Sequence, residues 1–267
     1  MKIFVCIKQV PGVSEVKIDP KTNTLVREGI PSIVNPHDKH AVELGLTIKE
    51  THGGEVIAIS MGPPQAEQAL REVLAMGVDK AYLLTDKAFA GADTLATSHT
   101  LALAINKLLK DSNEKYIVIC GTQAIDGDTA QVGPELAEEL VIPQITYVIK
   151  FELKKDDVVV VERVFRANEV VIIETKLPAL ISVLKEINKP RIPGIKGIVD
   201  AYQKKEVFFW NSEDLGADKV NIGLNGSMTE VWKIFIPERK GEHISLSGTP
   251  EEMTQKLITN LIDDKVL

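Results

Sequence analysis

The stretch Tyr116–Gly133, YIVICGTQAIDGDTAQVG, decides the fold class of this chain. It opens with an apolar run of strand length, Tyr116–Cys120, and continues through a loop of small and polar residues. The segment Gln131–Leu140 then has the composition of a helix. A strand that is apolar throughout is typical of a parallel sheet with helices on both faces. The stretch therefore predicts one strand–loop–helix unit of an α/β protein.

The same unit recurs on both sides of this stretch. Further strands are predicted at Lys2–Ile7, Glu55–Ser60, Ala81–Leu84 and Leu180–Leu184, and helices at Asn35–Glu50, Ala66–Leu74 and Asp93–Leu109. Two valine-rich runs, residues 158–165 and 170–174, lie close together and predict a small antiparallel excursion. Together these elements predict an α/β fold with a mostly parallel sheet flanked by helices.

The last third of the chain differs in character. It turns rich in proline and glycine after Asn188 (NKPRIPGIKG) and has few apolar runs before a final amphipathic helix at about residues 250–262. A long tail with little core of its own often packs on a partner chain. We therefore expect an α/β domain over residues 1–205 and an extended C-terminal arm and helix over residues 206–267.

Composition excludes several classes of protein. The 267 residues carry a net charge of -7, so the chain lacks the basic field of a nucleic-acid binder. No run approaches the roughly 18 apolar residues of a membrane span, and the N-terminal apolar run is too short for a secretory signal. Cys6 and Cys120 are the only cysteines, which excludes a cysteine zinc or iron–sulfur site and suits the cytoplasm. No histidine pair has zinc-ligand spacing with a third ligand, so no metal is expected.

The loop Gly121–Gly133 is the richest candidate site. In open α/β sheets, ligands bind where loops leave the carboxyl ends of strands, and main-chain amides at a helix start favour a phosphate. Thr122, Gln123, Thr129 and Gln131 add neutral donors. No lysine follows the glycine, so the loop is not a triphosphate P-loop. Asp126 and Asp128 would repel a phosphate, so we expect a turn residue and a helix cap there; a plain capped turn explains the loop equally well.

Three other strand-end loops are weaker candidates. In Phe89–Ser98, Asp93 or Thr94 can cap a helix, while Thr94 and Thr97 face one side and can donate to a ligand. Taken alone, this loop is more often a cap than a cofactor site. The segments Asn35–Asp38 and Ser60–Pro63 are ordinary turns in most proteins, with His37 the one histidine expected near the pocket. No G-x-S-x-G motif is present, so a hydrolase triad is unsupported.

Taken together, these loops resemble the β subunit of the electron transfer flavoproteins. The resemblance runs from residue 1 to about 262. Its segments are KIFVCIKQVPG, SIVNPHDKHAVE, VIAISMGP with LREVLAMGVDKAYLL, CGTQAIDGDTAQVGPELAEEL, KLPALISV and NKPRIPGIKGI. It implies an adenine-nucleotide α-hydrolase-like fold and an αβ heterodimer, in which the α subunit carries FAD and the β subunit holds a second nucleotide, AMP or FAD.

The resemblance also implies which residues contact the nucleotide and the partner. The implied nucleotide contacts are Cys6, Lys8, Asn35, Pro36, His37, Asp38, Met61, Gly62, Thr122, Gln123, Asp126, Gly127, Asp128, Thr129, Ala130, Gln131, Val132 and Gly133. The implied partner-binding loop is Asn188, Lys189, Pro190, Arg191, Ile192, Pro193, Gly194 and Ile195, with Ile195 as the apolar anchor. The C-terminal arm is then expected to embrace the α subunit.

The segment AFAGADTLATS is similar to the electron-bifurcating branch, in which this loop contacts FAD of the β subunit. Its residues Gly91, Ala92, Asp93, Thr94 and Thr97 join the expected flavin contacts. That branch accepts hydride from NADH and sends electrons to ferredoxin or flavodoxin and, through the α-subunit FAD, to a dehydrogenase or reductase of acyl-CoA, enoyl-CoA or lactate type. The redox chemistry belongs to the cofactor, so no side chain is assigned as catalytic.

Two alternatives remain beside the bifurcating branch. One is a non-bifurcating electron-transfer β subunit that holds AMP, and the other is a non-redox nucleotide-binding regulatory module on the same fold. The chain also departs from the family pattern at Arg166–Glu169, where many members carry an acidic, glycine-rich run. The family's Lys176-Leu-Pro178 end is intact, so the expected fold stands, while partners of the AMP-holding members do not transfer directly.

Overall fold

The computed structural model describes residues 1–12, 32–110, 114–166, 169–232 and 244–266. It divides into two compact units, Met1–Val231 and Trp232–Leu267. Residues 206–231, which we expected to belong to the arm, are part of the first unit. Within the described ranges, no helix is both long and apolar enough to span a membrane.

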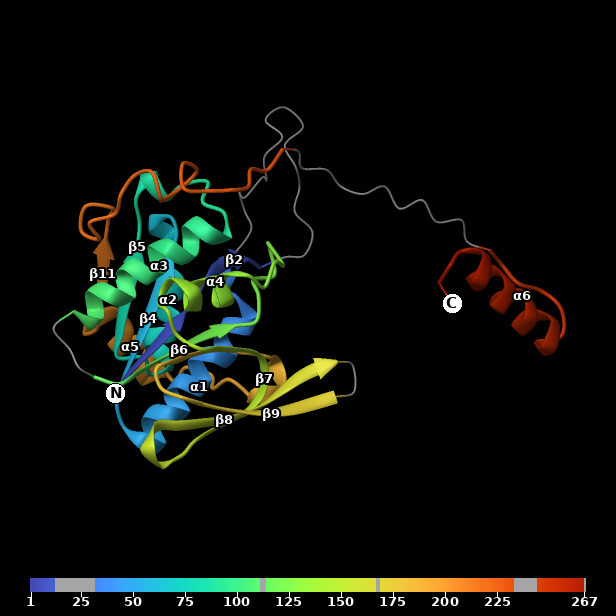
Figure 1. Ribbon diagram of the computed structural model, residues 1–267, viewed down its shortest axis with the longest axis horizontal. Coiled ribbons are helices and arrows are strands. Elements are labelled where there is room, and N and C mark those ends of the chain that lie inside the picture. The colour runs from blue at the N-terminus through green and yellow to red at the C-terminus, as the bar shows by residue number, and fades with distance from the viewer. Residues whose placement is uncertain (13–31, 111–113, 167–168, 233–243, 267) are drawn as a thin grey trace. The chain divides into compact units, whose positions relative to one another are not determined.

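The first unit is built on a nine-stranded sheet, counted over the described residues, with the order β11-β5-β4-β1-β6-β10-β7-β8-β9 (Figure 1). The strands are β1 Lys2–Cys6, β4 Glu55–Met61, β5 Lys80–Leu84, β6 Tyr116–Gly121, β7 Gln144–Leu153, β8 Val158–Arg166, β9 Glu169–Lys176, β10 Ala179–Val183 and β11 Val207–Trp210. A separate two-stranded sheet pairs β2 Gln9–Pro11 with β3 Ser32–Val34.

Strand direction confirms the predicted fold class. Every pair from β11 to β7 is parallel, and β7, β8 and β9 pair antiparallel, which is the predicted excursion. Residues 167 and 168, part of the Arg166–Glu169 departure, lie outside the described residues.

Helices cover both faces of the parallel sheet, as Figure 1 shows. They are α1 Pro36–His52, α2 Glu67–Met76, α3 Thr94–Leu109, α4 Val132–Glu139 and α5 Ile195–Gln203, with 3-10 turns η1 Pro64–Ala66, η2 Lys87–Phe89, η3 Lys155–Asp157 and η4 Lys185–Ile187. Side chains alternate along β1, so Ile3 and Val5 join the core under α1 and α2, while Phe4 and Cys6 join the core under α3 and α4. This double burial explains why the strands are apolar throughout.

The second unit contains α6, Pro250–Asp263, near the predicted position. Thr249 and Glu252 close its N-terminus as a capping box, in which each side chain binds the other residue's main-chain amide. The helix has no buried residue, and Leu257, Ile258 and Ile262 are each about half exposed. The apolar face of this amphipathic helix is therefore exposed to solvent.

Candidate functional site

The candidate site lies where neighbouring parallel strands end together. Strands β5, β4, β1 and β6 are consecutive in the sheet and parallel, so their carboxyl ends share one edge. The predicted segments Phe89–Ser98, Ser60–Pro63 and Gly121–Gly133, which follow or end β5, β4 and β6, therefore emerge at this edge. The fourth, Asn35–Asp38 at the start of α1, joins them through the contacts of Asn35 and Asp38. This edge is where open α/β sheets bind ligands.

Asp38 and Asn35 connect three of these segments. The Asn35 side chain is fully buried; its Nδ2 donates to Asp38 Oδ1 at 2.9 Å and to the Gln123 carbonyl at 2.8 Å. Asp38 Oδ2 accepts from the main-chain amide of Lys8 at 2.8 Å, and the carboxylate lies directly against Gly121 at the end of β6. The start of α1 is thereby fixed to the ends of β1 and β6.

Burial changes the protonation of Asp38. Loss of water raises the pKa of its carboxyl to about 7, against the hydrogen bonds from Asn35 and Lys8 that lower it. The side-chain ammonium of Lys8 forms an ion pair with Asp126 at 2.7 Å, and both side chains remain partly exposed. Asp126 therefore neutralises the basic group that a phosphate would otherwise meet.

The loop after β6 is a compact turn that its own side chains hold by hydrogen bonds. Thr122 donates through Oγ to the Val183 carbonyl at 2.6 Å, and Gln123 donates to Asp128. Asp128 and Ala130 both have φ near +55°, a region that asparagine, aspartate and glycine tolerate best. The N-cap of α4 is Gln131, so our prediction of a helix cap at Asp128 is wrong.

The start of α4 has the character of an anion site. No side chain caps it, so its first amides lack a side-chain partner, and the loop residues from Ile125 to Thr129 are exposed. A helix N-terminus of this kind carries a partial positive charge and donors that point outward. The predicted phosphate-binding role of this loop is compatible with its geometry.

Two glycines of this loop differ sharply in their surroundings. A Cβ at Gly121 would overlap Asp38 Oδ1 and crowd the backbone of His37, because α1 begins directly against β6. A Cβ at Gly127 would meet nothing within 4 Å. The close approach of α1 to the end of β6 therefore requires a glycine at position 121, whereas Gly127 lies in open space.

The loop after β5 lies beside α4. Asp93, one of the two predicted capping residues, caps α3 through a 3.0 Å bond from the Ala96 amide. Thr94 Oγ donates to Glu135 of α4 at 3.1 Å, and Ser98 Oγ, which donates to the Thr94 carbonyl at 2.8 Å, lies 3.2 Å from the Val132 carbonyl. The two predicted ligand loops thus form one continuous polar edge, but the hydroxyl proton of Thr94 is already directed at Glu135.

The same loop holds a distant part of the chain. Asp93 Oδ2 accepts from the main-chain amides of Met228 and Thr229 at 2.8 and 3.0 Å, and the amide of Asp93 donates to Ser227 at 2.8 Å. These partners are about 135 residues apart in sequence. Sequence reasoning found neither this anchor nor Glu135, since neither carries a motif.

The remaining predicted contacts lie at the same edge. Cys6 and Cys120 are directly paired on β1 and β6 and buried; the hydrogen bond between the two thiols, and then burial, raise the pKa of the Cys120 thiol. The amide of Gly62, next to Met61, donates to the Leu84 carbonyl at 3.0 Å. Burial lowers the pKa of His37.

The predicted partner-binding loop is held firmly at one end. Arg191 donates to Glu43 through its main-chain amide, Nε and Nη2, each at 2.9 Å, and to Glu50 through Nη1 at 2.6 Å. These carboxylates raise the pKa of Arg191. Beyond this anchor, Ile192 and Ile195 are 90% and 84% exposed. A rigid loop therefore presents two isoleucines to solvent.

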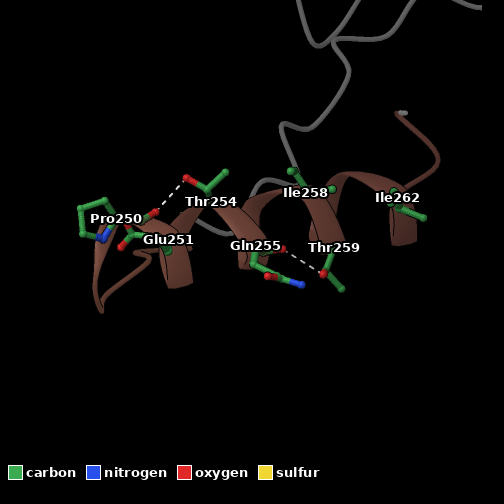
Figure 2. Close-up of a pocket in the computed structure, with 7 residues that line it drawn as sticks. All are labelled: Pro250, Glu251, Thr254, Gln255, Ile258, Thr259 and Ile262. Carbon is green, nitrogen blue, oxygen red and sulfur yellow. Dashed lines mark hydrogen bonds between the residues drawn. The ribbon is translucent and has the colours of Figure 1, made fainter.

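Two hollows in the described part of the chain lie away from the strand-end loops of the candidate site. The first hollow, of about 650 Å³, runs along the surface of α6. All seven of its lining residues come from this single helix, as Figure 2 shows. Another, of about 250 Å³, lies between α2 and the segment that contains Pro193 and Tyr202, so Pro193 of the predicted partner-binding loop lines it. The predicted nucleotide site is thus defined by its loops rather than by either hollow.

The fold and the strand-end loops define an α/β protein with its candidate site at the carboxyl edge of a parallel sheet, and comparison with known proteins makes the class specific. A family model described as the electron transfer flavoprotein domain matches residues 22–211. An electron transfer flavoprotein subunit beta from Thermoanaerobacterium thermosaccharolyticum is 54% identical over 98% of both chains. The caffeyl-CoA reductase-Etf complex subunit CarD of Acetobacterium woodii is 47% identical over the full length of both.

A further relative is the acryloyl-CoA reductase electron transfer subunit gamma of Anaerotignum propionicum, 41% identical over the full length of both chains. The chain belongs to the β-subunit family of the electron transfer flavoproteins. The predicted family is therefore confirmed.

Proposed function

We propose that this β subunit binds FAD at the edge formed by the ends of β5, β4, β1 and β6, and that it takes part in electron bifurcation. In this proposal FAD accepts a hydride from NADH, and its electrons pass to ferredoxin or flavodoxin and, through FAD of an α subunit, to a partner dehydrogenase or reductase. The relatives named for caffeyl-CoA and acryloyl-CoA reductase complexes support a partner that acts on an enoyl-CoA.

The observation that carries the proposal is the contact between the two ligand loops. The bond from Thr94 to Glu135, with Ser98 Oγ 3.2 Å from the Val132 carbonyl, joins the start of α3 to the start of α4. A flavin dinucleotide extends well beyond the footprint of AMP, so it needs a second polar loop next to the phosphate-binding one. Here that loop directly adjoins the uncapped start of α4.

Each segment of the edge has a distinct role in this proposal. The start of α4 and the loop from Thr122 to Gln131 would hold the phosphates through main-chain amides. Lys8 would contribute positive charge once Asp126 moves or accepts a water in its place. Thr94 and Thr97 would face the flavin end, with Thr94 accepting a hydrogen bond through Oγ while it donates to Glu135.

One observation favours the alternative in which AMP occupies the site. The hydroxyl proton of Thr94 is directed at Glu135, and Asp93 is fully engaged by Ala96, Met228 and Thr229. Fewer donors are then free at the flavin end than at the phosphate end. AMP would need only the phosphate end of the edge.

The deciding experiment is a nucleotide count. The chain is co-expressed with its α subunit, saturated with FAD, freed of excess, and denatured, and the released FAD and AMP are quantified by chromatography. Two FAD per heterodimer without AMP supports the proposal. One FAD and one AMP would instead establish the non-bifurcating alternative.

Two glycine variants locate the site. Gly121→Ala places a methyl group against Asp38 and is expected to lower the β-subunit nucleotide content, while Gly127→Ala meets no atom within 4 Å and is the matched control. The Thr94→Ala, Thr97→Ala double variant is expected to lose β-subunit FAD while it retains α-subunit FAD. Equal retention of both flavins in this double variant would show that the loop lies elsewhere.

We further propose that the loop Asn188–Ile195 grips the dehydrogenase and that the arm with α6 holds the α subunit. The exposed Ile192 and Ile195, fixed in place by Arg191, provide a small apolar patch for the first contact. The half-exposed Leu257, Ile258 and Ile262 of α6 provide the second. Exposed apolar patches of this kind are typical of protein interfaces.

A further inference from the structure

Asp93, at the start of α3, is bonded within the chain through both side-chain oxygens and its own amide. Oδ1 accepts the Ala96 amide at 3.0 Å, and Oδ2 accepts the amides of Met228 and Thr229 at 2.8 and 3.0 Å and the Thr229 hydroxyl at 3.0 Å. The amide of Asp93 donates to Ser227 Oγ at 2.8 Å. Because these groups are already engaged, Asp93 acts on a ligand through the groups that it holds.

Residues 223–229, which we call the clasp, also touch the loop after β5 through their backbone. The Leu224 amide donates to the Ala90 carbonyl at 3.1 Å. A Cβ at Gly223 would stand 2.0 Å from the Ala88 carbonyl oxygen. The clasp and the loop therefore meet main chain to main chain, and a glycine at position 223 is what allows this approach.

The clasp has a rigid base. Ile222, directly before it, is 1% exposed and belongs to the hydrophobic core under α3 and α4. Within the clasp, Ser227 Oγ donates to the Gly223 carbonyl at 2.8 Å, and the Gly226 amide donates back to the Ile222 carbonyl at 3.1 Å. The clasp is thus a compact turn fixed to the core, so it can hold the loop after β5 in place.

We propose that Asp93 and the clasp position the loop after β5 for the flavin end of FAD, and so raise the affinity of the site for FAD without changing that for AMP. The inference rests on the proposed function. Asp93 is a positioning residue in it: one carboxylate both caps α3 and binds the clasp, so Thr94 and Thr97 of the first turn keep a fixed place. AMP needs only the phosphate end of the edge.

Two variants disrupt the clasp in different ways. Asp93→Asn replaces one carboxylate oxygen by an NH₂ donor, which cannot accept from two main-chain amides, while asparagine caps a helix as well as aspartate does. Gly223→Ala places a methyl group against the Ala88 carbonyl and leaves Asp93 unchanged. Agreement between the two variants therefore points to the clasp rather than to either side chain alone.

Each variant has a matched control between β11 and the clasp. Gly216 has a φ of +61°, close to the +58° of Gly223, so alanine strains the backbone equally at both positions. A Cβ at Gly216, however, meets no described atom within 4 Å. Asp218→Asn makes the same chemical change as Asp93→Asn at a carboxylate that binds the amide of Val220. Both controls should behave as the wild type.

The first measurement needs no nucleotide. Amide hydrogen exchange in the full chain, followed by NMR, reports on the amides of residue 93, Met228 and Thr229, whose bonds join the clasp to the loop. We expect protection in the wild type and the controls, and exchange at least about tenfold faster in both variants. Unprotected amides in the wild type, or equal exchange in all five proteins, overturn the inference.

The second measurement compares the affinities for FAD and for AMP at the β-subunit site of the heterodimer, with FAD of the α subunit in place. We expect each clasp variant to bind FAD at least about tenfold more weakly and AMP less than about twofold more weakly, because the lost bonds position only the flavin end. Equal losses for both nucleotides would reveal a merely structural role and overturn the inference.

The wild type tests the proposed function, and the variants test the inference. If the wild type takes up a second FAD and both variants bind it equally well, the inference fails and the proposed function stands. If the wild type binds AMP and no second FAD, the proposed function fails and the role of the clasp in FAD binding falls with it.

Discussion

Asp86, at the residue scale, shows how one carboxylate holds two distant turns. It accepts from the amide of Ala88 at 3.0 Å and from the amide and hydroxyl of Ser212 at 3.0 and 2.6 Å. These bonds lower the pKa of Asp86 to about 2. The turn that follows β5 is thereby tied to the segment that follows β11.

Acid should therefore weaken the fold partly through Asp86. Its folded pKa lies below the ordinary 3.8, so its contribution to stability is complete above about pH 4 and is lost as pH falls through about 2. We expect Asp86→Asn to be less stable by about 1 to 3 kcal/mol at neutral pH and to lose less stability between about pH 4 and about pH 2. Urea unfolding at several pH values measures this. Asp218→Asn, which loses a single bond to Val220, is the control.

The two thiols should be inert in the folded protein. Cys6 and Cys120 are buried, and a raised pKa keeps the Cys120 thiol protonated, while only a thiolate reacts rapidly. We expect little reaction with a thiol reagent at mildly alkaline pH and two reacting thiols after unfolding. Rapid reaction of both thiols in the native protein would contradict their burial.

Sequence predicted the position of the candidate site better than the role of each residue in it. Apolar strands in alternation with helices place all four loops at one edge, and the structure has them there. The two donors to the Asp38 carboxylate come from residues 8 and 35, and Asp93 bonds with Met228 and Thr229. Such contacts depend on which segments the fold brings together, so no local sequence pattern predicts them.

At the scale of elements, each missed segment has its own physical cause. The strand β7 lies between a parallel and an antiparallel neighbour, and its mixed burial gives neither a continuous apolar run nor a strict alternation. The strand β11, VFFW, is short and lies in the segment that we expected to be an arm. The helix α5 follows a run rich in proline and glycine that hides its start.

Close packing of α5 on α2 depends on Gly197. A Cβ there would overlap the Ala75 carbonyl, so Gly197→Ala should push the two helices apart and cost about 1 to 3 kcal/mol. Gly194→Ala, at the N-cap of the same helix, is the control, because a Cβ there meets nothing within 4 Å and its φ of -78° suits alanine. Urea unfolding of both variants measures the difference. Equal stability would show that the helices separate without cost.

At the scale of the whole molecule, the two units carry separate tasks. The first unit contains both hydrophobic cores and every residue of the candidate nucleotide edge. The second contains α6, which has no buried residue. The fold of the first unit does not draw on the second for its core.

A chain that ends at Val231 should therefore fold and fail to assemble. We expect its circular dichroism and its unfolding transition to match those of the first unit in the full chain, and its co-purification with the α subunit to be lost. Leu257→Gln combined with Ile262→Gln tests the same interface in the full-length chain. Loss of folding on truncation, or assembly that persists in both proteins, would contradict the separation of tasks.

The strand order also limits when each strand can pair while the chain is being synthesised. During synthesis β1 leaves the ribosome first, but its second neighbour, β6, begins only at Tyr116. Strand β7 emerges before β10, yet β10 must insert between β6 and β7, so both wait with open edges until Ala179–Val183 has been translated. Exposed edges and late long-range pairing favour aggregation of nascent chains. A chaperone that shields the growing chain over this interval would therefore raise the yield of native subunit.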